Sequence, residues 1–177
     1  MPAARCSLAT LNALDAEAFA ALLGGVFEHS AWIARAAYSA RPFGSVAELH
    51  AAMLRVVTDA SVDRQLRLLQ AHPVLAQPGP DELTAASAAE QAGIGLDRLA
   101  ADETAVLDAL NRAYRARFGF PFIIAVRGQR DRAAILAALQ SRVGNPPDQE
   151  RTTALAEVAK IARFRLHDLI AENGNAG

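Results

Sequence analysis

The sequence predicts an all-α protein, a single-domain bundle of about eight helices with one buried extended segment near residues 120–127. Apolar residues recur at helical spacing along almost the whole chain of 177 residues. Only the stretch "FGFPFIIAVRG", residues 118–128, departs from that period, because it combines aromatic and β-branched residues with an internal proline. One strand-like segment cannot form a sheet alone, so helices must build the core. We therefore expect one domain over residues 1–177, with its core at about 11–173.

Two helices are predicted before residue 42. Asp15 can cap the first helix. The apolar positions of that helix follow the spacing of a buried face: Phe19, Leu22, Leu23 and Val26. The second helix starts at Ser30 and stops before Pro42, because a residue that precedes proline is pushed away from α geometry.

Two further helices precede residue 73. Ser45 and Glu48 form a capping box at the start of the third, in which hydroxyl and carboxylate satisfy backbone amides reciprocally. The fourth carries an apolar stripe at three- and four-residue spacing: Val62, Leu66 and Leu69. That helix runs into His72 and Pro73, where the proline ends it.

Four helices are predicted after a loop over residues 74–83, whose "PGP" is typical of a turn. A short helix covers 83–93, and a longer one covers 101–117 with Gly119 just past its end. The longer helix has these inward positions: Val106, Leu107, Leu110 and Tyr114. Another helix covers 131–143, and the last is expected to run from about 148 to 173, with Gly174 as its stop.

Composition excludes several function classes. Hydrophobic residues make up 52% of the chain and charged residues 21%, which is typical of a globular protein rather than a disordered one. The formal net charge of −1 leaves no basic excess for nucleic acid. Cys6 is the single cysteine, so an intrachain disulfide is excluded. No apolar run approaches the roughly 20 residues of a membrane span. The opening residues lack the apolar core of a secretory signal, so we expect a cytoplasmic protein without a membrane partner.

His72 is the first candidate for chemistry. The proline after it ends the helix, so the imidazole is presented at a helix C-terminus, where partial negative charge stabilises the protonated ring. With an ordinary pKa of about 6.5, histidine can exchange protons near neutrality. The alternative is a surface histidine that merely caps the helix. The other histidines, among them His29 and His50, are far apart and lack a metal-ligand spacing, so we expect no metal site.

The segment "SAAEQ", residues 87–91, also has two interpretations. Ser87 and Glu90 match a capping box. Alternatively Ser87, Glu90 and Gln91 share one helix face and offer a hydroxyl, a carboxylate and an amide to a site. A carboxylate beside an imidazole orients the ring and raises its pKa.

Two more features are open to a structural or a functional interpretation. Arg165 falls at the edge of the apolar stripe of the last helix, so it is either ion-paired or snorkelling, or is directed at an anionic ligand. The extended stretch "FPFIIA", residues 120–125, is either core, or offers unpaired backbone groups to a ligand rich in ureide groups.

Five stretches taken in order resemble the OHCU decarboxylase family, where OHCU is 2-oxo-4-hydroxy-4-carboxy-5-ureidoimidazoline. They are "FEHSAWIA" (27–34), "AHPVLA" (71–76), "SAAEQAG" (87–93), "FGFPFIIAVRG" (118–128) and "EVAKIARFRLHDLI" (157–170). The resemblance covers about residues 11–170. It implies an all-helical enzyme, often a homodimer, that converts this ureidoimidazoline to (S)-allantoin in the last step of urate degradation without a cofactor.

The resemblance also assigns site residues. His72 takes the position of the catalytic histidine, and Glu90 is its expected partner. The expected substrate-binding residues are Pro73, Ser87, Ala88, Ala89, Gln91, Phe122, Ile123, Ile124, Ala125, Val126 and Arg165. The chain departs from the family where Ala31 replaces a frequent proline and Val74 a frequent aspartate. Two other functions stay open: a decarboxylase of a related ureide, and a non-catalytic helical module that binds a small anion or a partner.

Overall fold

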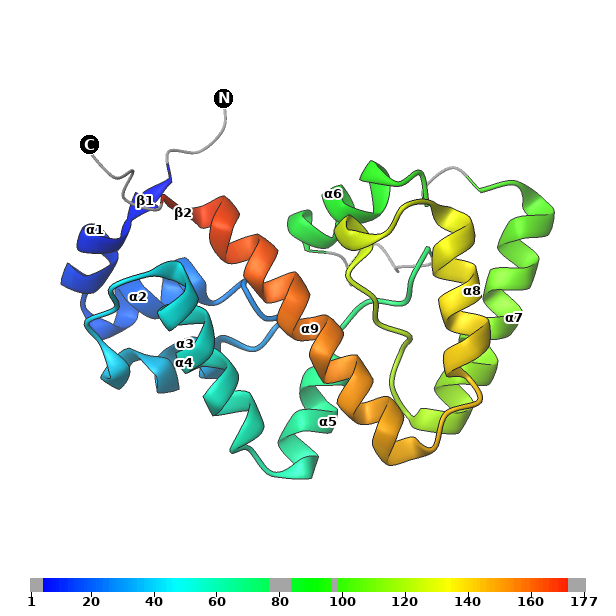
Figure 1. The fold of residues 1–177 in the computed structure, drawn as a ribbon, viewed down its shortest axis with the longest axis horizontal. Helices are drawn as coiled ribbons and strands as arrows, with labels where there is room; N and C mark the ends of the chain where they lie inside the picture. The colour runs from blue at the N-terminus through cyan, green and yellow to red at the C-terminus, as the bar shows by residue number, and fades with distance from the viewer. Residues whose placement is uncertain (1–4, 77–83, 97–98, 172–177) are drawn as a thin grey trace. The chain divides into compact units, whose positions relative to one another are not determined.

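A computed structural model describes residues 5–76, 84–96 and 99–171 of the chain (Figure 1). Its helices are α1 (Leu8–Ala13), α2 (Ala16–Leu23), α3 (Ala31–Ala37), η1 (Tyr38–Ala40), α4 (Val46–Thr58), α5 (Val62–Gln70), α6 (Ala85–Gly93), α7 (Ala101–Phe118), η2 (Val126–Gly128), α8 (Arg132–Arg142) and α9 (Pro147–Leu169), where η marks a 3-10 helix. Two short strands, β1 (Cys6–Ser7) and β2 (Ile170–Ala171), complete the described elements. The predicted all-α class is confirmed.

The chain divides into two compact units, and each is described by itself. The first unit comprises the described residues of Met1–Gln65 and Ala159–Gly177, and the second comprises those of Leu66–Val158. The division falls inside α5 and α9. The expectation of one domain over residues 1–177 stays a prediction.

In the first unit, α3 packs against both α2 and α4. The predicted caps are present, since the Asp15 carboxylate accepts from the Ala18 N–H at 2.8 Å and Ser45 Oγ accepts from the Glu48 N–H at 3.1 Å. The Glu48 carboxylate, however, accepts from the Gly44 N–H at 2.7 Å. The capping box therefore reaches one residue further back than predicted.

The strands lie in this unit too, and they were not predicted. β1 and β2 pair in parallel, with Cys6 opposite Ile170 and Ser7 opposite Ala171, as Figure 1 shows. The last helix therefore ends at Leu169, earlier than the predicted residue 173, because the chain becomes extended to join β1. The predicted stop at Gly174 lies outside the described residues. α1 was also missed, although Ser7 caps it and Leu8 and Leu11 are buried.

In the second unit, α7 packs against α8. Gly119 ends α7 in the left-handed conformation (φ 77°), as its predicted position past the helix requires. Tyr114 on α7 is fully buried within ring contact of Phe118, Phe120 and Phe122. Burial raises the pKa of Tyr114, and its hydrogen bond to Glu150 raises it further. The hydroxyl is therefore a permanent donor.

The predicted buried extended segment lies between α7 and η2. Every residue of the stretch 120–126 is buried, and the segment pairs with no strand among the described residues. Two apolar residues predicted to face the core do not, because Val62 is 50% exposed and Val106 is 47% exposed. The buried face of α7 follows Leu107, Asn111, Tyr114 and Phe118 instead, and the buried residues of α5 are Leu68 and Leu69. No described helix combines the length and apolarity that crossing a membrane requires.

Candidate active site

His72 lies just after the last turn of α5 and is only 8% exposed. Its backbone N–H donates to the Leu69 carbonyl at 3.2 Å, which continues the helix by one turn before Pro73. Its ring Nδ1 lies 2.9 Å from the Leu68 carbonyl oxygen. Because a carbonyl can only accept, Nδ1 carries a proton. Nε2 is therefore the nitrogen that can gain or lose a proton without breaking this bond. The ring is therefore not at the surface, but it does cap α5, because Leu68 lies in the last turn of that helix.

The segment after His72 is tied to α6 and α7. The Ala76 N–H donates to Gln91 Oε1 at 2.9 Å, and Ala76 has a positive φ of 62°. The Leu75 carbonyl accepts from Asn111 Nδ2 on α7 at 3.0 Å. Gln91 therefore uses its oxygen to hold this segment, which leaves its amide nitrogen as the donor that could serve a ligand.

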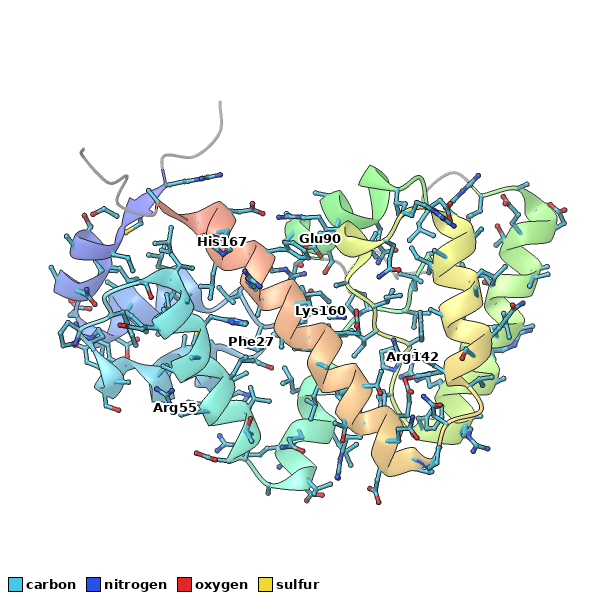
Figure 2. The ribbon with its side chains drawn as sticks, in the orientation of Figure 1. Phe27, Arg55, Glu90, Arg142, Lys160 and His167 are labelled. Atoms are coloured by element: carbon cyan, nitrogen blue, oxygen red, sulfur yellow. The ribbon has the colours of Figure 1, made fainter. Side chains whose placement is uncertain are left out.

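α6 carries the predicted polar group on one face. Ser87 and Gln91 are buried one turn apart, whereas Ala88 and Ala89 are exposed. Glu90, labelled in Figure 2, is half-buried. The N-cap of α6 is Thr84, whose Oγ1 accepts from the Ser87 N–H at 3.2 Å. The capping-box interpretation of Ser87 and Glu90 is therefore wrong, and both side chains lie within the helix.

The C-terminal end of the extended segment leads to α6, the helix that carries these polar residues. η2, which begins at Val126, contacts α6. Phe122, Ile123, Ile124 and Ala125 precede it and are all buried. Among the described residues, the backbone of this stretch is held by side chains, since Arg142 donates to the Ile123 carbonyl and Glu157 accepts from the Ala125 N–H, each at 2.8 Å. Figure 2 shows Arg142 beside the segment.

Arg165 belongs to the first unit and is 5% exposed. Its Nη1 lies 2.8 Å from Glu28 Oε2 and 3.3 Å from the Gly25 carbonyl oxygen. Glu28 is completely buried. Of the structural alternatives predicted for Arg165, the ion-paired one is therefore correct and the snorkelling one is wrong. The role of Arg165 toward a ligand stays a prediction.

Several residues that position the site were not found from the sequence: Glu28, Asn111, Arg142 and Glu157. A helical wheel of α9 could have indicated Glu157, because it lies one turn from Ala154 and Ile161, which are both buried. Arg142, Asn111 and Glu28 carried no comparable signal, since each acts through a contact with a residue far away in the sequence.

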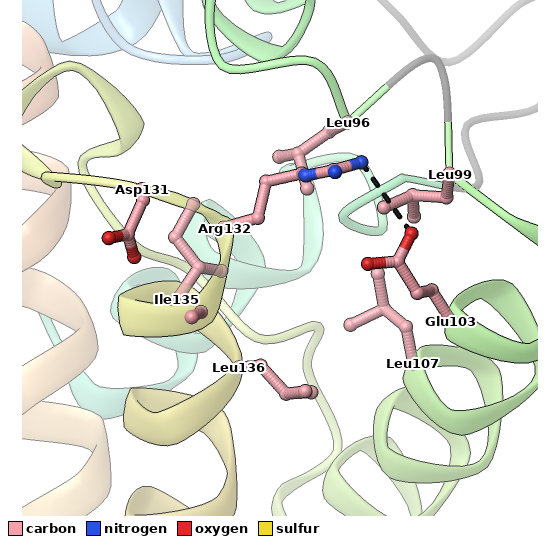
Figure 3. A pocket seen from close by; sticks show the side chains of 9 residues that line it. Leu96, Leu99, Glu103, Leu107, Asp131, Arg132, Ile135 and Leu136 are labelled. Carbon is pink, nitrogen blue, oxygen red and sulfur yellow. Dashed lines mark ion pairs between the residues drawn. The ribbon is translucent and has the colours of Figure 1, made fainter.

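A cavity of about 360 Å³ lies elsewhere in the second unit and contains none of the predicted site residues. It lies between α7 and α8 and is lined mostly by aliphatic side chains, with an ion pair of Arg132 and Glu103 at 3.6 Å (Figure 3). Size alone would make it a candidate ligand site. His72, just after α5, and Glu90 on α6 do not line this cavity, and their catalytic roles stay predictions.

Comparison with known proteins identifies the family. The profile of the OHCU decarboxylase family matches residues 12–167. The chain belongs to the OHCU decarboxylase family. The match includes every predicted site residue, from His72 to Arg165. The resemblance seen in the five sequence stretches is confirmed.

Individual members of the OHCU decarboxylase family are similar over most of the chain. The 2-oxo-4-hydroxy-4-carboxy-5-ureidoimidazoline decarboxylase of Haloferax volcanii is 46% identical over 90% of this chain and 94% of its own. The crystal structure of an (S)-allantoin synthase is 35% identical with a TM-score of 0.73, over 93% of this chain and 54% of that one. An OHCU decarboxylase crystallised in the presence of (S)-allantoin is 25% identical with a TM-score of 0.66, over 88% of this chain and 98% of that one.

Proposed function

We propose that the chain decarboxylates 2-oxo-4-hydroxy-4-carboxy-5-ureidoimidazoline to (S)-allantoin, the last step from urate, without a cofactor. The observation that carries this proposal is the family match over residues 12–167, together with a relative of that activity at 46% identity. The buried imidazole of His72 and the half-buried carboxylate of Glu90, both in the second unit, support the proposal.

The substrate supplies its own electron sink. When the bond between C4 and the carboxylate breaks, its electron pair forms the C4–C5 double bond, and the former C5=N electrons move to the ring nitrogen, which takes a proton. The resulting enol then gains a proton at C5 and loses one from the C4 hydroxyl. One proton is consumed overall and CO₂ leaves. The protein must therefore move protons and choose one face of C5.

His72 is the proposed proton-transfer residue, acting through Nε2. Its Nδ1 is committed to the Leu68 carbonyl at 2.9 Å, which fixes the ring. A ring held in this way delivers a proton from one direction, which is what a single enantiomer requires. Glu90 is the proposed partner that tunes this transfer from α6.

The remaining predicted residues hold the substrate in this proposal. Ser87 and the Gln91 amide nitrogen donate from α6, and Pro73 with the α6 turn of Ala88 and Ala89 shapes the wall. The backbone of Phe122–Val126 meets the ureide. The assignment of Arg165 to the carboxylate or the ureide rests on the family resemblance alone. Each of these groups would orient the breaking bond perpendicular to the imine plane.

The test uses fresh substrate made from urate by the two preceding enzymes, with allantoin formation followed by circular dichroism. We expect the protein to produce (S)-allantoin far faster than spontaneous decay. Replacing His72 with Asn should reduce turnover by roughly 10²-fold or more, since that is the usual contribution of a general acid–base. A matched control is His50→Gln, which changes a half-buried histidine outside the proposed site.

Three outcomes would contradict the proposal in different ways. Racemic product at the background rate would remove the proposed activity. Near-normal turnover by His72→Asn with a folded protein would remove the assigned role of His72. Faster turnover of another ureide would redirect the proposal to a related substrate.

We also propose that the enzyme acts as a homodimer in the cytoplasm, as the family resemblance implies. Its ligand is the small ureidoimidazoline, and no nucleic acid or membrane takes part. Fractionation of the source cells, with detection of the untagged protein, tests the compartment.

A further inference from the structure

We propose that Arg142 and Glu157 are positioning residues that polarise the two peptide groups of Ile124 toward the ureide of the substrate. The proposal deepens the function proposed above and depends on it. The extended segment belongs to no sheet among the described residues. Its buried backbone groups therefore need partners other than a neighbouring strand.

The two charged side chains hold alternate peptide groups on one edge of the segment. Arg142 Nη1 donates to the Ile123 carbonyl, and Glu157 Oε2 accepts from the Ala125 N–H, each at 2.8 Å. In extended backbone the N–H and C=O of one residue point to the same side, and those of the next residue point to the opposite side. The N–H and C=O of Ile124 therefore face away from both charges.

The signs of the charges suit this arrangement. The Ile123 carbonyl and the Ile124 N–H belong to one peptide unit, so a cation on that carbonyl makes the N–H a stronger donor. The Ala125 N–H and the Ile124 carbonyl belong to the next unit, so an anion on that N–H makes the carbonyl a stronger acceptor. Hydrogen bonds in a buried chain polarise one another in this cooperative way. A ureide, which carries N–H donors beside a carbonyl acceptor, complements such a pair.

The anchors are themselves fixed. The Arg142 guanidinium donates from Nε and Nη2 to Glu150 Oε1, at 2.8 and 2.6 Å, and lies over the Phe122 ring at 4.5 Å. Glu150 is completely buried and also accepts from Tyr114 and Asn145. Glu157 is 8% exposed. The several bonds of Arg142 keep its geometry, and burial restricts Glu157, as a positioning role requires.

Steady-state kinetics of three variants tests the proposal. Glu157→Leu removes the acceptor, Glu157→Gln keeps an acceptor without the charge, and Val158→Ala creates a small cavity beside it on the same helix. No bond within the ureide is made or broken in the reaction, so we expect the effect in KM more than in kcat. KM should rise roughly tenfold for Glu157→Leu and by an intermediate factor for Glu157→Gln, in proportion to the hydrogen bond lost. Val158→Ala should lower Tm without changing KM.

A second readout follows the segment directly. Amide hydrogen exchange of residues 120–126 should accelerate in Glu157→Leu and not in Val158→Ala. A KM for both Glu157 variants within twofold of Val158→Ala would overturn the proposal, and turnover by the wild type would leave the proposed function intact. If Glu157→Leu fails to fold, the KM of Glu157→Gln decides the same question. Absence of wild-type turnover would overturn the proposed function and this inference together.

Discussion

Arg165 shows at the scale of one residue how a charge is kept inside this protein. Its guanidinium is 5% exposed and lies 2.8 Å from a carboxylate of Glu28, which has no exposed surface. Breaking such a pair by removing one partner leaves a buried charge without its counter-ion. Replacing one member of the pair should therefore destabilise the protein more than replacing both members.

Replacing Glu28 with Leu should lower the free energy of unfolding by about 3–5 kcal/mol, because Arg165 then stays buried without its carboxylate. Urea unfolding followed by circular dichroism measures the loss. The control is the double variant Glu28→Leu with Arg165→Met, which should recover most of it. No recovery in the double variant would show that Glu28 acts on something other than Arg165.

His50 gives a prediction for pH. Burial of the ring lowers its pKa, the hydrogen bond from Nε2 to the Ala159 carbonyl opposes this, and the charges of Arg163 and His167 add to the lowering. The unfolded chain takes up this proton at a higher pH than the folded chain, at about 6.5. The contribution of His50 to stability is therefore complete above pH ~6.5 and declines as the pH falls below it.

Thermal unfolding between about pH 5 and 8 tests this sign. The wild type should lose Tm on the acid side more steeply than His50→Gln, which cannot titrate but can still donate to the Ala159 carbonyl. Parallel curves for the two proteins would contradict the predicted role of His50.

At the scale of an element, the end of α7 depends on one glycine. Gly119 has a φ of 77°, and a side chain there would meet no atom within 4 Å. A side chain at position 119 would therefore destabilise the protein through its backbone conformation and not through a clash with neighbouring atoms. Gly119→Ala should lower the free energy of unfolding by about 1 kcal/mol, because alanine adopts the left-handed region poorly.

A second glycine provides the control for the Gly119 variant. Gly93 lies within α6, has no positive φ and also has free space around it. Gly93→Ala should stabilise the protein by roughly 0.5–1 kcal/mol, since alanine favours a helix. Denaturant unfolding measures both variants. Equal effects of the same sign would contradict the assignment of Gly119 to a conformational cap.

At the scale of the whole molecule, the proposed homodimer is directly measurable. Light scattering after gel filtration should give twice the chain mass of 18.7 kDa at micromolar concentration. Dilution should not change that mass if the interface has the size of a stable dimer. A mass of one chain at all concentrations would contradict the proposal.

Much of the fold was predictable because its helices carry their own signals. The N-caps Asp15 and Ser45 predicted where α2 and α4 begin, and Gly119 predicted where α7 ends. β1 and β2 gave no such signal, since two residues are too few to show a period. Their pairing depends on a contact between the two ends of the described chain.

The site was predictable where a residue conflicted with its surroundings. His72 before a proline and Arg165 on an apolar stripe both stood out, and both are buried. Glu157 lies on the buried face of α9, where a helical wheel could have indicated it. Arg142 did not stand out, because its importance comes from a bond to a backbone carbonyl 19 residues away. Local pattern carries no information about a partner of that kind.

The pairing of β1 with β2 has a practical consequence for engineering. Neighbouring strands run about 4.8 Å apart, so the chain enters and leaves the described fold at one spot, as Figure 1 shows. Because the two strands are parallel, a linker that joins Ala171 to Cys6 and closes the backbone into a ring must cross back along the pair, which takes about a dozen residues. By the same geometry, the whole fold could be inserted into a surface loop of a carrier protein without pulling that loop open.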